Sequence, residues 1–126
     1  EAYKHIITPL KTEELKNHPQ GDFLSGLRTA CRRLIIDGPN AVIATLPDET
    51  CMLVMDHKKL RPATVGGKPG IWAMASEICG VDAMIPDRDR SLDFQPMREH
   101  TVIIPPDRKE MVIWSQFDQF VLPQAA

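Results

Sequence analysis

The sequence predicts an α+β domain: an antiparallel sheet of two β-hairpins with two amphipathic helices packed on it. Residues 41–55 and 100–114 read as the same hairpin twice, because Pro47-Asp48 in the first matches Pro106-Asp107 in the second. Each hairpin segment follows a stretch with helical spacing of apolar residues. The two halves therefore suggest an internal helix–hairpin duplication.

The composition is that of an ordinary globular protein. Of the 126 residues, 43% are hydrophobic and 25% are charged. A single domain of this length buries roughly two-thirds of its unfolded surface, so it needs no metal or disulfide to fold. We therefore expect one domain over residues 1–126, no cofactor and no metal, with residues 1–20 as a candidate docking arm.

Charge and cysteine content limit the classes of protein. The net charge of −2 argues against a dedicated duplex-binding domain, which normally carries a basic surplus. Three cysteines are an odd and sparse set, which favours a reducing, cytoplasmic location over a secreted disulfide framework. No apolar run is long enough for a membrane span. The chain begins with Glu1, so we expect a trimmed, processed or partial chain.

The first half contains two helical segments and a hairpin. Residues 12–16 resemble one or two helical turns with Thr12 as the cap, closed by the turn formers at 19–21. Residues 22–34 predict an amphipathic helix, because one stripe carries Phe23, Leu24, Leu27, Ala30, Cys31 and Leu34. The hairpin follows at 41–46 and 51–55 and is apolar at most positions, so we expect much of both faces of its sheet to be covered.

The second half repeats this order with a longer connection. Pro69 suits the first position of a helix and Gly80 the position after its end, so we expect a helix over residues 71–79. Cys31 and Cys79 lie in the two helical stripes, which predicts buried, inert thiols. Residues 80–99 read as a long charged surface loop before the second hairpin. Residues 116–122 form a strand extension or a docking segment.

The strongest candidate for a ligand site is the glycine-rich segment at residues 65–70. Gly66 and Gly67 would let backbone N–H groups approach an anion, and Lys68 adds a positive charge before the expected helix. The spacing of a phosphate-binding loop is absent. A plain flexible connection is the simpler interpretation.

Three further groups of residues invite a functional interpretation. His57 and Asp56 at a strand end are weak catalytic candidates, and zinc binding with Cys51 and His100 lacks the usual ligand spacing. The alternating run Asp87, Arg88, Asp89, Arg90 suggests a solvated loop that faces a partner. A basic face would form if the helix end and the hairpin end met, and it would contain Arg28, Arg32, Arg33, Lys58 and Lys59.

These features favour a non-enzymatic binding or assembly module that acts through a protein partner or self-association. Paired hairpins leave edge strands, so homodimerisation through an edge is expected. A phosphate- or nucleotide-handling enzyme that uses residues 66–70 is the first alternative. A nucleic-acid-binding domain with a basic face is the second and is less favoured, because aromatic residues are few. No membrane partner is expected.

Overall fold

The computed structural model of the chain describes residues 11–34, 36, 38–114 and 119–121. Its helices are α2 (Thr12–Asn17), α3 (Gly21–Cys31), α4 (Ile78–Met84) and the short 3-10 helix η1 (Arg90–Leu92). Its strands are β1 (Ala41–Thr45), β2 (Cys51–Met55), β3 (Thr64–Lys68), β4 (Ile71–Ala75), β5 (Thr101–Ile104), β6 (Val112–Trp114) and β7 (Gln119–Val121). The predicted α+β class with antiparallel pairing is confirmed.

The two predicted hairpins form one sheet, with the strand order β1-β2-β5-β6-β7. β2 pairs antiparallel with β5, placing Met52 opposite Ile103 at the junction of the hairpins. β7 covers residues 119–121 of the predicted tail strand and pairs with β6. The remainder of that tail segment and residues 1–10 of the predicted arm lie outside the described residues.

The two hairpin turns adopt the same local geometry. In the first turn, Glu49 has a φ of 69° and its N–H donates to the Leu46 carbonyl at 2.9 Å. In the second, Arg108 has a φ of 57° and its N–H donates to the Pro105 carbonyl at 2.9 Å. An aspartate side chain accepts a backbone N–H two residues on in both turns. The matching Pro-Asp segments therefore encode matching turns, while descent from a duplication stays a prediction.

The predicted helix over residues 71–79 is wrong, because residues 71–75 form β4, which pairs with β3 in a second sheet of two strands. Pro69 and Gly70 form the turn between these strands, and Gly70 has a φ of 96°. Proline followed by glycine with positive φ is typical of a type II turn. The helix begins only at Ile78, and Cys79 on it is exposed, whereas Cys31 is buried as predicted.

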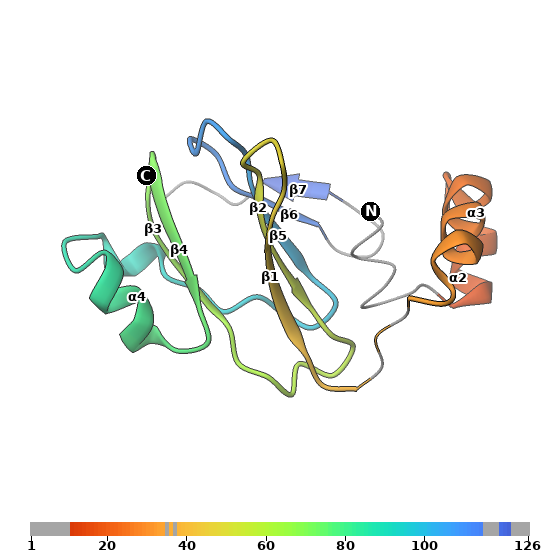
Figure 1. The fold of residues 1–126 in the computed structure, drawn as a ribbon, viewed down its shortest axis with the longest axis horizontal. Helices are drawn as coiled ribbons and strands as arrows, with labels where there is room; N and C mark the ends of the chain where they lie inside the picture. The colour runs from red at the N-terminus through yellow and green to blue at the C-terminus, as the bar shows by residue number, and fades with distance from the viewer. Residues whose placement is uncertain (1–10, 35, 37, 115–118, 122–126) are drawn as a thin grey trace.

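The main core lies between the two sheets. Leu53, Val102 and Ile113 on the large sheet face Val65 of β3 and the half-buried Trp72 and Met74 of β4. Ala73 points to the other side of β4, where it packs with Val81 and Ile85 of the α4 region. Figure 1 shows the resulting layers, with the large sheet, the β3–β4 hairpin and α4 in succession.

Two predictions about peripheral segments need correction. The sequence predicts that α3 packs on the sheet, but α3 packs against α2 through Leu24 and Leu15, and Figure 1 shows this helical pair beside the sheets. Residues 80–99 were expected to form a long surface loop, but they contain most of α4 and all of η1. The segment is ordered because α4 packs on both strands of the β3–β4 hairpin and η1 packs on β3.

Leu53→Ala tests the assignment of the core. Leu53 is fully buried, whereas Ile71 of β4 is 44% exposed. We expect Leu53→Ala to lower the free energy of unfolding by about 2–5 kcal/mol through lost burial and a cavity. Ile71→Ala, at an exposed strand position, is the control and should change it by less than about 1 kcal/mol. Denaturant unfolding measures both, and equal effects would contradict the described packing.

Candidate functional site

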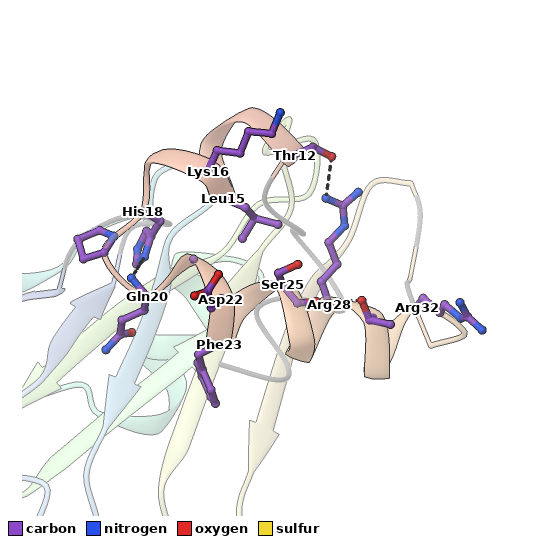
Figure 2. Close-up of a pocket in the computed structure, with 13 residues that line it drawn as sticks. Thr12, Leu15, Lys16, His18, Gln20, Asp22, Phe23, Ser25, Arg28 and Arg32 are labelled. Carbon is purple, nitrogen blue, oxygen red and sulfur yellow. Dashed lines mark hydrogen bonds between the residues drawn. The ribbon is translucent and has the colours of Figure 1, made fainter.

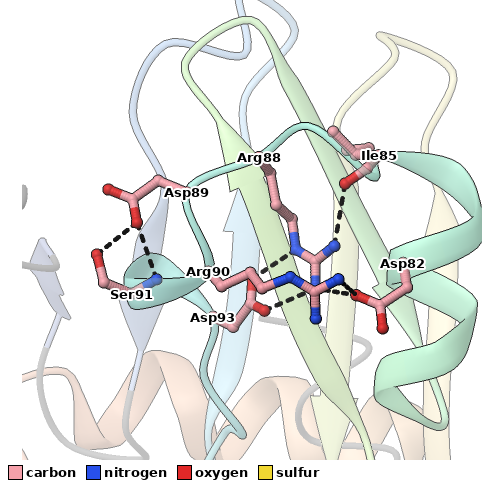
Figure 3. A network of polar contacts seen from close by, with 7 residues as sticks. All are labelled: Asp82, Ile85, Arg88, Asp89, Arg90, Ser91 and Asp93. Atoms are coloured by element: carbon pink, nitrogen blue, oxygen red, sulfur yellow. Dashed lines mark hydrogen bonds and ion pairs between the residues drawn. The ribbon is translucent and has the colours of Figure 1, made fainter.

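A buried arginine organises the segment that the sequence suggested was a solvated loop. The Arg88 side chain is fully buried, and its Nε and Nη2 donate to the two carboxylate oxygens of Asp93, both at 2.7 Å. Its Nη2 also donates to Asp82 at 2.7 Å, and its Nη1 donates to the Ile85 carbonyl at 3.0 Å. Figure 3 shows this network, with Arg90 reaching the same Asp82 carboxylate from outside.

The prediction that the run from Asp87 to Arg90 faces solvent is therefore wrong for one of its four residues. Arg88 points inward, whereas the other three residues of the run are exposed. Arg88 points inward because the carboxylates that accept its hydrogen bonds, Asp82 and Asp93, lie outside the run. The remaining exposed surface of this run keeps its interpretation as a partner-facing loop, as a prediction.

Gly66 and Gly67 do not form a loop before a helix, because both lie in β3 and are buried. A Cβ atom at Gly66 would collide with the Asp93 carboxylate and would lie 3.0 Å from Arg88 Nε. Glycine at this position thus leaves room for the buried ion pair. The anion-binding geometry expected of a helix N-terminus is not present at these residues.

Lys68 lies at the end of β3 and has an acidic partner. Its Nζ is 2.9 Å from the Asp87 carboxylate, and both side chains are substantially exposed. The structure therefore joins two groups that the sequence separated, the glycine-lysine segment and the charged run, into one cluster. In this cluster the lysine charge is paired with a carboxylate of the same chain.

The cluster changes the acidity of its carboxyl groups. Hydrogen bonding from Arg88 lowers the pKa of Asp82 below its ordinary value, with a further contribution from the charge of Arg90. Lys68 lowers the pKa of Asp87, first through its hydrogen bond and then through its charge. Hydrogen bonds from Ser91 lower the pKa of Asp89. The two carboxylates beside Arg88 raise its pKa, so the guanidinium stays charged.

Asp56 and His57, which directly follow β2, both make hydrogen bonds with neighbouring segments. The buried Asp56 carboxylate accepts the backbone N–H of Asn40 at 2.9 Å and those of Lys58 and Lys59. It thereby ties the start of β1 to the turn after β2. His57 Nδ1 lies 2.8 Å from the Glu99 carboxylate. The role of either residue in catalysis stays a prediction.

The basic residues predicted to form one face are divided between two parts of the fold. Arg28 and Arg32 line an open groove between α2 and α3, of about 1240 Å³. Figure 2 shows Arg28 crossing this groove towards Thr12, to which its Nη1 donates at 3.3 Å. Lys58 and Lys59 follow β2 at the end of the large sheet, and Arg33 lies just beyond α3. Nucleic-acid binding by the complete set stays a prediction.

Within the described part of the chain, no three histidine, cysteine, aspartate or glutamate side chains gather closely enough to hold a metal ion. None of the helices described here combines the length and the apolar character needed to cross a membrane. Comparisons of the chain with protein-family models, curated proteins and solved structures find no match. The fold therefore defines an α+β domain, and its function has to be inferred from its surfaces.

Arg88→Met should destabilise the domain far more than Arg90→Met. Loss of Arg88 leaves two carboxylates with no buried partner beside β3, whereas Arg90 is 62% exposed and its ion pair is screened by water. Denaturant unfolding of the two variants measures the difference. Equal unfolding midpoints would contradict a structural role for the buried guanidinium.

Acid should destabilise the domain through the same cluster. Asp82, Asp87 and Asp89 have folded-state pKa values below the ordinary 3.8. The unfolded chain therefore binds protons more readily, and the stabilisation is complete above that value and is lost as the pH falls through the folded-state values. We expect the free energy of unfolding to decline from about pH 5 to about pH 2, and less steeply in Asp87→Asn. Denaturant unfolding across this range measures both slopes.

Proposed function

We propose that this domain is a non-enzymatic assembly module that joins another copy of itself through the free edge of β1. The single observation that carries the proposal is the character of this edge. β1 is the terminal strand of the large sheet, and no described strand pairs with its outer side. From residue 41 to residue 45 the strand has neither a charged residue nor a proline. Sheet edges normally carry such residues to prevent association.

The hydrogen-bond pattern identifies which backbone groups of β1 are available. The Asn40 carbonyl accepts from Asp56, and the Leu46 N–H donates to Thr50, so the even-numbered residues bond to β2. In an antiparallel ladder, the alternate residues then point their N–H and C=O groups outward. These outward residues are Ala41, Ile43 and Thr45, and Ile43 is 52% exposed.

A second copy is the simplest partner for this edge. An antiparallel pair of β1 strands centred on Ile43 places Ala41 of each copy opposite Thr45 of the other. Every outward N–H and C=O group at these positions gains a partner, and the two Ile43 side chains cover each other. The result is a continuous sheet across the two copies, which is a common mode of strand addition.

Cross-linking at position 43 tests the proposal directly. In a background of Cys51→Ser and Cys79→Ser, we expect Ile43→Cys to form a disulfide-linked dimer on mild oxidation, because the two-fold axis brings both thiols within bonding range. Met97→Cys is the matched control, since Met97 is 58% exposed but lies outside the strands. It should not cross-link.

Ile43→Lys provides an independent test in solution. At the two-fold axis, the lysine of one copy would lie opposite the lysine of the other, and the two positive charges would repel. The variant should therefore sediment as a smaller species than the unmodified protein at the same concentration. Met97→Lys, which adds the same charge elsewhere, should sediment as the unmodified protein does. A monomeric unmodified protein at high micromolar concentration would overturn the proposal.

A further inference from the structure

Helix α3 and the turn after it leave several apolar side chains unburied. Leu24 is 2% exposed and packs against Leu15 of α2, and Cys31, seven residues further along the same side, is also buried. Four residues form a second side, here called the outer stripe: Phe23, Leu27 and Ala30 of α3, and Leu34 in the turn after it. Phe23 and Leu34 are 62% and 61% exposed, Ala30 is exposed and Leu27 is half-buried.

The outer stripe faces away from α2 and borders open space. Figure 2 shows the Phe23 side chain on the side of α3 opposite to α2. A Cβ atom added at Gly26, which flanks the stripe, would meet no atom within 4 Å. A neighbouring helix could therefore approach the backbone closely at Gly26 and Ala30.

The spacing of the outer stripe is the same from either end. Its residues follow one another at intervals of four, three and four positions. Two antiparallel copies of α3 would therefore place Phe23 against the partner's Leu34, and Leu27 against the small Ala30. The turn after α3, closed by the Leu34 N–H bond to the Cys31 carbonyl at 2.8 Å, supports Leu34 at the end of the stripe. A large residue meets a small one at the centre, as close helix packing requires.

The charges beside the stripe fit the same arrangement. Asp22 precedes Phe23 at the start of α3, and Arg33 precedes Leu34 in the turn after α3, so charges of opposite sign lie at the two ends of the outer stripe. An antiparallel pair brings the start of one stripe to the end of the other. Each Asp22 then faces the partner's Arg33, and this attraction occurs twice in the dimer.

We propose that α3 forms a second self-association interface, in which two copies of the chain pack their outer stripes antiparallel around a two-fold axis. This interface is independent of the β1 edge, because it uses a helix that stands beside the sheets. A protomer with both interfaces builds assemblies larger than a dimer. A chain with one interface disabled stops at the dimer formed by the other.

Charge reversal in the Ile43→Lys background tests this interface alone. We expect Ile43→Lys to remain dimeric, and Asp22→Arg or Arg33→Asp to weaken that dimer at least about tenfold, because each places two like charges in contact. The double variant Asp22→Arg/Arg33→Asp recreates the attraction with reversed polarity, so its dissociation constant should return to within about threefold of the background value. Sedimentation equilibrium measures all four proteins.

The double variant distinguishes a loss of association from a loss of helix stability. It still lacks the acidic residue in the first turn of α3, so a loss of helix stability would not be reversed, whereas a lost attraction between copies would be. Phe23→Ser should also abolish the dimer, while Leu60→Ser, at an equally exposed leucine outside α3, should not. A monomeric Ile43→Lys protein at several hundred micromolar (roughly the range for weak dimers) would overturn the α3 interface and leave the β1 edge proposal standing. Failure of the double variant to recover the dimer would also overturn it.

Discussion

The buried guanidinium of Arg88 is the contact on which the smaller layer of the fold depends. It bonds to Asp82 in α4, to the Ile85 carbonyl at the end of that helix, and to Asp93 just after η1. The residue after Asp93 is Phe94, which exchanges two backbone hydrogen bonds with Val65 and packs in the main core. A single charged side chain thus holds a helix, a 3-10 turn and a strand together. Its burial is tolerable because its guanidinium is hydrogen-bonded to two carboxylates and a carbonyl.

The parts of the fold that the sequence predicted correctly are those with a strong local signal. The hairpins at β1–β2 and β5–β6 combine apolar strands with a Pro-Asp turn, and α3 has clear helical spacing. The sequence of β4 predicts a helix because both faces of the strand are covered, Trp72 and Met74 by the main core and Ala73 by α4. A strand apolar at every position has no two-residue periodicity. The Pro69-Gly70 turn was the local signal that could have identified it.

The candidate site was harder to predict, for a different physical reason. Nothing in the run from Asp87 to Arg90 distinguishes the buried arginine from the exposed one, because the aspartates that neutralise Arg88 include one five residues further on and one six residues earlier. Gly66 has no side chain, but the space beside it is occupied by the ion pair of Arg88 and Asp93 and not by a ligand. Local sequence reports residue type, whereas burial of a charge depends on partners that only the fold brings together.

Beside the main core, the two sheets are also joined through a single main-chain carbonyl. The Arg108 carbonyl, in the β5–β6 turn, accepts the Gly70 N–H at 2.8 Å and the Trp72 indole N–H at 2.9 Å. What this contact needs from position 108 is a left-handed backbone conformation, which glycine and asparagine adopt at least as readily as arginine. The exposed side chain at this position can therefore vary between related sequences without loosening the joint. The residue types found at position 108 in related sequences would therefore reflect selection on the surface of the protein and not on the packing of its core.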